Sequence, residues 1–430
     1  MLYEGLRQKR PGKLAILSYE NRAPQTLPAA DAASCAITLL PLPWLNGPST
    51  TRKTMIMFRF HLMFSLPCLF VIARCVWPLP WSVRARLAAA AMLLLASQYH
   101  LYSRLSSGSV FSPEFPREIV IAFNWAFSAI LLLALSQLAL DIITLLGSLL
   151  RWRRLAIPPA VRYGLAAAAM ALAAIGVHQA IRVPPLKDIE IHMAKLPPQF
   201  DGYQIVQLTD LHISRLFDAP WTRAVVADTN ALDADLIVVT GDMIDGAIDE
   251  RAPDVAPLRG LHARDGVYVI PGNHEYFFGH DAWMQYFAGL GMTALDNSHA
   301  ILERGGAKLV LAGVTDVTAP NSGLPAPDVA QALKGAPADT AIVLLDHQPR
   351  NARHAAARGS SLQLSGHTHG GLIAGLDRLF ALANGGFVSG LYGVDGMQLY
   401  VNNGTALWQG LALRLGRPSE LTRITLRKSN

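Results

Sequence analysis

The sequence predicts an all-α transmembrane region of about four helices followed by an α/β domain. The first observation behind this prediction is charge: residues 1–182 hold 18 Lys and Arg against 6 Asp and Glu, whereas residues 183–430 hold 19 against 25. The second is pattern, because long apolar stretches give way to short β-branched runs near residue 200. The chain is also only 16% charged, and an ordinary soluble protein carries roughly 25% charged residues. We therefore divide it into residues 1–56, 57–182 and 183–430.

The first segment, residues 1–56, is rich in Pro, Ala and Thr and shows no helical or strand period. We interpret it as a disordered tail or as a mis-assigned start, because Met55 or Met57 would serve as an initiation site. It lacks the arrangement of a cleavable signal peptide, since its charges precede no contiguous apolar core. All three cysteines lie before residue 76, so the sequence predicts no disulfide framework and no thiolate metal site further on.

The membrane region is predicted from four apolar stretches, at residues 60–73, 87–101, 119–140 and 163–181. A spanning helix needs about 20 apolar residues, so the last two stretches satisfy the criterion and the first two are short. The alternative is a set of buried helices in a large soluble core. Asp141 follows the third stretch directly, and we expect it at the membrane interface.

Membrane orientation is predicted from the basic residues between these stretches. The first and third links together carry seven arginines, whereas the second carries two (Arg74, Arg84, Arg86, Arg151, Arg153, Arg154 and Arg162 against Arg104 and Arg117). By the positive-inside rule, the first and third links lie in the cytoplasm. The prediction is a multi-pass protein of the inner cell membrane whose C-terminal domain is extracytoplasmic, although Arg182 and Lys187 after the last stretch argue for the opposite orientation.

In residues 183–430, five short apolar runs each end in a polar cluster. The runs are residues 205–208, 236–239, 267–270, 341–345 and 362–364. Runs of this length are typical of strands buried on both faces under helices. In open α/β sheets the ligand site lies beyond the carboxyl ends of the strands. We therefore expect the clusters to meet at one edge.

The clusters supply seven potential metal ligands, all carboxylate, amide or imidazole: Asp210, His212, Asp242, Asn273, His347, His367 and His369. This set is suited to divalent Mn, Fe or Zn. Seven ligands are too many for one ion and suit two if a carboxylate bridges them, an arrangement that activates water and clamps phosphoryl oxygens. The alternatives are turn chemistry for the acidic and amide residues and a surface imidazole for the histidines. His347 is favoured over His354 because it directly follows a strand.

Taken in order, Asp-x-His, Gly-Asp-x-x-Asp, Gly-Asn-His-Glu, a lone His and Gly-His-x-His resemble the calcineurin-like metallophosphoesterases. The Gly-Asn-His-Glu form and the membrane-spanning first half are similar to the membrane-associated bacterial branch that includes YkuE-like proteins. The resemblance covers about residues 186–427 and implies a four-layer α/β/β/α sandwich. It implies that Asp242 bridges two metals. The remaining ligands would divide as Asp210, His212 and His369 for the first metal and Asn273, His347 and His367 for the second.

The resemblance also implies two catalytic residues. His274 corresponds to the histidine that contacts the phosphate and protonates the leaving oxygen, and Asp245 to the carboxylate that orients it, although Asp245 would also suit a helix cap. Glu275 stands where the family more often has Asp. Asp316 is either a support for the site or a turn residue. We expect Trp283, Tyr286 and Phe287 in a core, and His262, His280 and His299 in solvent.

The predicted function is hydrolysis of a phosphoester or pyrophosphate bond by a membrane-anchored dinuclear-metal enzyme. The membrane region and the resemblance suggest a lipid-linked substrate, such as a UDP-diacylglucosamine-type molecule. The alternatives are a phosphodiesterase of soluble or cyclic nucleotides, and a non-catalytic metal-binding head of a membrane assembly. The expected partners are a phosphorylated small molecule or lipid and the bilayer. Nucleic acid is not expected, because the second half is net acidic and Arg350, Arg353 and Arg358 form no long basic stripe.

Overall fold

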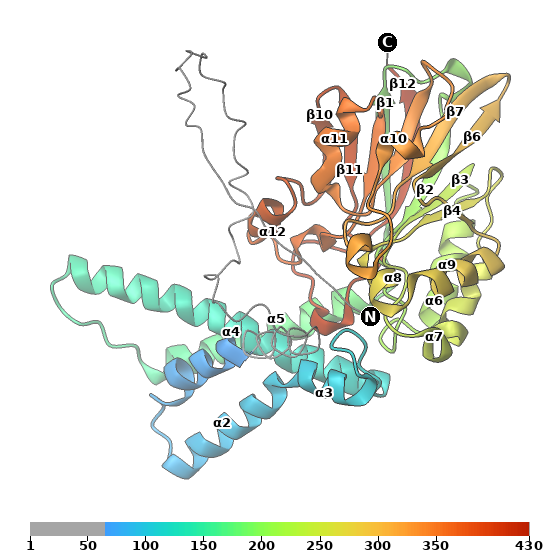
Figure 1. Ribbon diagram of the computed structural model, residues 1–430. Helices are drawn as coiled ribbons and strands as arrows, with labels where there is room; N and C mark the ends of the chain where they lie inside the picture. Colours follow the sequence, from blue (N-terminus) through green and yellow to red (C-terminus); the bar gives the residue numbers. More distant parts are fainter. Residues whose placement is uncertain (1–64, 430) are drawn as a thin grey trace, which may run out of the picture. The chain divides into compact units, whose positions relative to one another are not determined.

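The computed structural model describes residues 65–429, so the predicted tail or mis-assigned start at residues 1–56 lies outside it. Two six-stranded sheets form the second part of the chain (Figure 1). The first sheet has the order β1-β12-β2-β3-β4-β5. Its strands are β1 (Leu186–Met193), β2 (Gln204–Leu208), β3 (Leu236–Thr240), β4 (Val267–Ile270), β5 (Thr293–Ala294) and β12 (Leu421–Lys428). Strands β2 to β5 run parallel, and β12 is antiparallel to β2.

The second sheet has the order β10-β11-β9-β8-β7-β6. Its strands are β6 (Ser298–Arg304), β7 (Ala307–Gly313), β8 (Ala341–Leu345), β9 (Leu362–Ser365), β10 (Gly390–Val394) and β11 (Met397–Val401). The four central strands are parallel, and the two edge strands are antiparallel to their neighbours. The five apolar runs expected from the sequence are strands β2, β3, β4, β8 and β9. They divide between two sheets.

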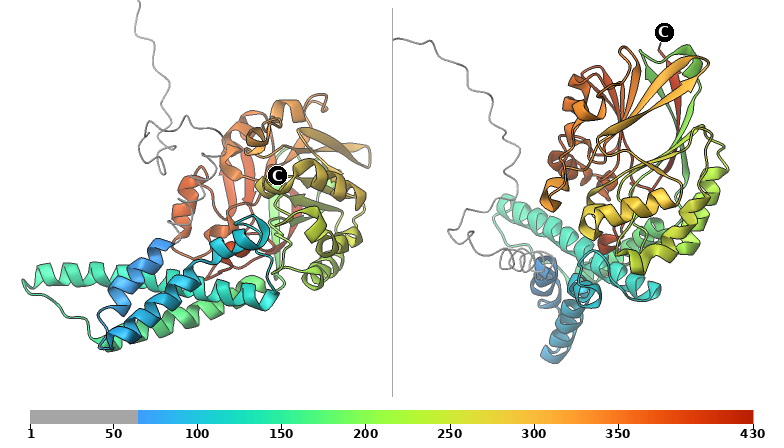
Figure 2. Two further views of the ribbon diagram at one scale, coloured as in Figure 1. Left: turned by 60° about the horizontal axis from the view of Figure 1, so that its bottom comes forward. Right: turned by 45° about the vertical axis from the view of Figure 1, so that its right-hand side comes forward.

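The alternation of side chains along each strand builds the layers. In β2, Ile205 faces the core between the two sheets, and Val206 faces a second core on the outer side. Helices α6 (Ala219–Asn230), α7 (Ile248–Val255) and α9 (His280–Gly289) cover this outer side (Figures 1 and 2). The outer side of the second sheet packs on α10 (Val329–Ala332) and α11 (Ala352–Ala357). The result is the α/β/β/α sandwich implied by the resemblance.

The first part of the chain is helical, and its helices are unequal in length. After a helix at residues 65–76, the chain forms α2 (Val83–Ser97), α3 (Tyr99–Ser107), α4 (Arg117–Leu150) and α5 (Pro159–Ile181). Helices α4 and α5, with 34 and 23 residues, are long and apolar enough to cross a membrane. Helix α2 has 15 residues, or about 22 Å at 1.5 Å per residue, against the roughly 30 Å of a bilayer core.

The four predicted spans are therefore not all present among residues 65–429. The stretch at residues 87–101 is divided between α2 and α3 at Gln98, whose amide donates to Ser65 Oγ at 3.0 Å. The stretch at residues 60–73 begins outside the described range. Two possible spans, α4 and α5, are supported. The other apolar stretches predicted longer helices than the structure has among the described residues.

Candidate metal centre

The polar residues that follow the strands of both sheets converge on one site. Strands β2, β3 and β4 of the first sheet and β8 and β9 of the second each end two to five residues before a predicted ligand or catalytic residue. In this order they deliver Asp210 with His212, Asp242 with Asp245, Asn273 with His274, His347, and His367 with His369. All these side chains except those of His367 and His369, which are partly buried, are buried.

The turns after the strands hold several of these residues in left-handed backbone conformations. Asp210, His212 and Asp242 have φ values of 52°, 41° and 53°. Such conformations cost about 1–3 kcal/mol each for a residue other than glycine and gather at functional sites. Gly241, before Asp242, has φ 90°, and a Cβ there would lie 2.6 Å from the Gly272 nitrogen. Only glycine allows the turns after β3 and β4 to approach this closely.

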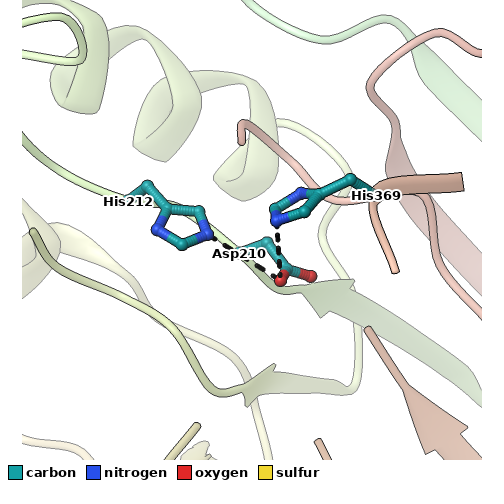
Figure 3. Close-up of side chains that lie close together, drawn as sticks. All are labelled: Asp210, His212 and His369. Atoms are coloured by element: carbon teal, nitrogen blue, oxygen red, sulfur yellow. Dashed lines mark ion pairs between the residues drawn. The ribbon is translucent and has the colours of Figure 1, made fainter. Parts of the chain in front are cut away.

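One ligand cluster consists of Asp210, His212 and His369, which come from opposite sheets (Figure 3). The two imidazole rings stand on either side of the carboxylate. Asp210 Oδ1 lies 3.9 Å from His212 Nε2 and 3.7 Å from His369 Nε2. Both spacings leave room for an ion between acid and imidazole.

A second cluster consists of Asp242, His347 and His367. Asp242 Oδ2 lies 3.2 Å from His347 Nε2 and 3.8 Å from His212 Nε2. Asp242 therefore lies between the two clusters, as a bridging carboxylate must. Asn273 begins helix α8 (Asn273–Phe278) one residue before His274, whose backbone N–H donates to Asp242 Oδ1 at 2.8 Å.

Several potential ligand atoms at this site have no hydrogen-bond partner among the described residues. Among the described residues, His212 Nε2, His347 Nε2 and Asn273 Oδ1 are buried without a hydrogen-bond partner. His347 Nδ1–H donates to Thr240 O at 2.8 Å, and His212 Nδ1–H to Asp245 Oδ1 at 3.0 Å. These bonds leave the Nε2 lone pairs toward the site, the arrangement usual for metal-binding histidines. The donor set thus fits divalent metals.

His274 lies beside the two clusters. Its Nδ1–H donates to Asp245 Oδ1 at 2.6 Å, so Asp245 supports His274 and His212 through a single oxygen. The other ring nitrogen, His274 Nε2, lies 4.0 Å from Asp242 Oδ2. Asp245 thus connects one predicted ligand to the predicted proton donor.

The titratable groups of the site change one another's pKa values. Burial alone would lower the pKa of His274, but Asp242 and Asp245 raise it to about 9. Burial works against ionisation of Asp242, yet His347 and His274 hold its pKa well below the usual range. Burial and His347 lower the pKa of His367 to about 3. The carboxylates therefore favour positive charge near Asp242, while His367 remains a neutral imidazole.

Glu275, whose role the sequence leaves open, is buried and connects two turns of the site. Its carboxylate accepts main-chain N–H groups from Gly272 at 2.7 Å, Asp242 at 3.0 Å and Met243 at 2.7 Å. It thereby ties the turn after β3 to the turn after β4. Burial and the nearby charge of Asp242 raise the pKa of Glu275.

Arg414 is a second supporting residue, and it was missed. Its guanidinium is fully buried and donates to the carbonyl oxygens of His369, Asn403, Ala406 and Arg417 at 2.6–3.1 Å. It fixes the loop after β11 against the His369 turn. The one signal in the sequence is a lone arginine within an apolar run at residues 411–415.

His347 lies in the site, whereas His354 is exposed on α11. Asp316 is buried and accepts from Thr318 and from Gln348, the residue after His347, so it is both a turn residue and a support. Trp283 and Phe287 belong to the outer core, with Tyr286 packed against it. Of the three histidines expected in solvent, His262 is exposed, and His280 and His299 are half-buried.

The family is decided by similarity to known proteins. A family model described as calcineurin-like phosphoesterase matches residues 203–371. A protein of Bacillus subtilis named uncharacterized metallophosphoesterase YkuE is 31% identical over 247 residues, which cover 56% of this chain and 84% of that protein. The chain belongs to the calcineurin-like metallophosphoesterase family. It carries the metal-dependent phosphoesterase domain of this family, which uses a dinuclear metal centre, and its His/Asp clusters could bind metal ions.

Two further relatives of this metallophosphoesterase extend the comparison. An uncharacterized metallophosphoesterase of Helicobacter pylori is 33% identical over 257 residues, covering 59% of this chain and 67% of that one. A zebrafish (Danio rerio) protein named transmembrane protein with metallophosphoesterase domain is 34% identical over 270 residues, covering 60% of this chain and 61% of the relative. The chain thus spans less than two thirds of the zebrafish protein. Helices α4 and α5 of this chain are themselves long and apolar enough to cross a membrane.

Proposed function

We propose that this metallophosphoesterase is anchored in the inner membrane and hydrolyses a phosphoester or pyrophosphate bond of a lipid-linked substrate. The observation that carries the proposal is the pair of ligand clusters meeting at Asp242, with His274 beside them. A purely structural metal site would be closed by its ligands and would have no need of a neighbouring acid–base histidine.

Each residue has a role in this proposal. One metal would be held by Asp210, His212 and His369, and the other by Asn273, His347 and His367. Asp242 would contact both metals. When bound, two divalent ions, of Mn, Fe or Zn, would stabilise charge on the phosphoryl oxygens and would make water more acidic. The chain's own contribution is to hold these ligands with their buried lone pairs directed inward.

His274 is proposed to protonate the leaving oxygen. Its Nδ1–H is held by Asp245 at 2.6 Å, which leaves Nε2 to face the substrate. The neighbouring carboxylates raise the pKa of His274 to about 9, so the ring carries a proton at neutral pH. Asp245 is therefore proposed to fix both the orientation and the charge of the donor.

Membrane anchoring is proposed to rest on the α4 and α5 hairpin. Trp125 Nε1 of α4 donates to Met170 O of α5 at 3.0 Å. The part of α4 farthest from the sheets carries exposed apolar side chains (Leu135, Leu138, Ile142, Ile143, Leu145, Leu146, Leu149 and Leu150). These suit contact with acyl chains, and a phosphoesterase held there would meet lipid-linked substrates first.

The hairpin also supports the predicted orientation. Its two ends contact the sandwich domain, because Arg117 Nε donates to Leu216 O at 3.1 Å and Trp221 Nε1 donates to Arg182 O at 3.4 Å. The turn of the hairpin, residues 151–162, carries four arginines and no acidic residue. The positive-inside rule favours a cytoplasmic turn and an extracytoplasmic sandwich domain. A C-terminal reporter that is active only in the cytoplasm should then be silent, and a strong signal would reverse the assignment.

The decisive test of function is hydrolysis of bis-p-nitrophenyl phosphate by the full chain in nanodiscs. The protein is stripped of metal and then supplied with Mn²⁺, Zn²⁺, Fe²⁺ or Mg²⁺. We expect turnover that depends on metal, is lost in Asp242→Ala and is retained in the exposed-histidine control His262→Ala. Metal-loaded, folded protein without turnover on this diester or on a phosphatidic acid would refute the proposal.

A further inference from the structure

The segment between α3 and α4, residues 108–116, connects the helical region to the catalytic site. Ser112 is buried, and its hydroxyl donates to the main-chain oxygen of Asp245 at 3.1 Å. Glu114 accepts two hydrogen bonds from the fully buried Arg251, at 2.7 and 2.6 Å, and one from Arg215 at 2.7 Å. The segment is thereby held against the turn that carries Asp245.

From this segment, Phe111 reaches the imidazole of His274. The two ring centroids are 5.5 Å apart at 67°, an edge-to-face arrangement. Phe111 also stacks on Phe277 at 5.0 Å and contacts Trp408 at 5.5 Å, and Phe277 lies 5.2 Å from His274. We call Phe111, Phe277 and Trp408 the aromatic wall. It is assembled from three distant parts of the chain beside the proposed proton donor.

The aromatic wall is partly exposed, and its ring contacts continue into the helical region. Phe277 is 48% exposed, and Phe111 and Trp408 are half-buried. Trp408 lies 5.5 Å from His100 of α3, which lies 5.0 Å from Phe127 of α4. A chain of rings thus runs from the catalytic site to the helices proposed to enter the membrane.

We propose that the aromatic wall binds the hydrocarbon part of the substrate's leaving group, so that the enzyme prefers phosphoesters of apolar, lipid-like alcohols. The inference rests on the proposed function, because it takes His274 as the donor to the leaving oxygen. A group receiving a proton from His274 must lie beside that ring. The surface there is aromatic and Phe277 is 48% exposed, so burying hydrocarbon against these rings is favourable.

The test measures binding, so that it does not depend on turnover. Alkylphosphonates from methyl to hexyl are titrated calorimetrically into the Mn²⁺-loaded full chain in phosphatidylcholine nanodiscs, with titrations into empty nanodiscs subtracted. Each buried methylene contributes about 0.8 kcal/mol, or about a fourfold change in affinity. We expect affinity to rise about two- to fourfold per methylene in the wild-type protein, since the wall covers only part of the chain.

Two variants and one control decide the result. Phe111→Ala and Phe277→Ala should flatten the dependence on chain length while methylphosphonate binding stays unchanged. Phe277→Ala removes an exposed ring and should fold normally. The control Phe115→Ala alters the same segment, but Phe115 packs near Phe123, at 6.2 Å, and should keep the wild-type slope.

The outcomes separate this inference from the proposed function. Affinity independent of chain length in the wild type, or an unchanged slope in both wall variants, would overturn it and show that the rings only pack the helical region against the sandwich. A slope that depends on the wall would support it. Bis-p-nitrophenyl phosphate turnover, measured on the same samples, would report separately on the proposed function.

Discussion

Replacing Glu275 by glutamine should destabilise the sandwich domain by about 1.5–3 kcal/mol. The Glu275 carboxylate accepts three main-chain N–H groups. A glutamine oxygen at the Oε2 position would still accept from Asp242 and Gly272. The amide nitrogen would then face the Met243 N–H, which in the wild-type protein donates to Oε1 at 2.7 Å. The variant therefore loses this charge-assisted hydrogen bond and leaves the buried Met243 N–H without an acceptor. Relief of the buried charge, which already raises the pKa of Glu275, offsets part of the loss and favours the lower figure.

Thermal unfolding of the full chain in nanodiscs, with metal chelated and at one scan rate, would measure this loss. A domain of this size loses about 2–4 °C in Tm per kcal/mol, so the expected shift is about 3–12 °C downward. Glu303→Gln is the matched control, because Glu303 is 63% exposed in its ion pair with Lys308. The control should stay within about 2 °C of wild type. Equal Tm values for the two variants would refute the bracing role.

Three further perturbations have defined outcomes. Asp245→Asn keeps an oxygen that can accept from both His274 and His212 but loses the negative charge that strengthens both bonds, so metal content or kcat/KM should fall about 10- to 100-fold, and wild-type values for both would contradict the shared support. Arg414→Met leaves several buried carbonyls without donors and frees the His369 turn, so thermal unfolding should show a loss of about 3–5 kcal/mol, whereas an unchanged Tm would exclude that role. Adding metal at 100 times its Kd to chelated protein should raise the free energy of unfolding by about 2.7 kcal/mol per bound ion. A Tm that does not respond to metal would argue against a preformed site.

Much of the site could be predicted because its ligands are encoded locally. Each follows a short apolar run, and parallel strands bring their carboxyl ends together, so Asp210, Asp242 and His347 could be expected in one place before any fold was known. The sandwich itself followed from resemblance, because apolar runs alone do not show whether five strands share one sheet or divide between two.

The rest depended on contacts between residues distant in the chain. Glu275 supports main-chain groups 32 and 33 residues away, and Phe111 meets His274 across the boundary between helical region and sandwich. Sequence periodicity carries no sign of such contacts. The break at Gln98 was missed for a related reason, since an apolar stretch gives composition but not helix length.

The polar residue Asn124 shows why the two regions work as one unit. In an apolar helix facing lipid, an unsatisfied amide would be costly. On α4 the Asn124 amide donates to Gln409 O at 2.9 Å, and its oxygen accepts from Ala412 N at 2.6 Å. The next loop residues pack on the hairpin as well, with Leu413 against Leu132 and Ala173. Helix α4 at 34 residues extends about 51 Å, well beyond a bilayer core of about 30 Å, so its first turns are free to dock the sandwich. The same docking sets residues 108–116 against Asp245, so the helical region and the sandwich together place Phe111 beside His274.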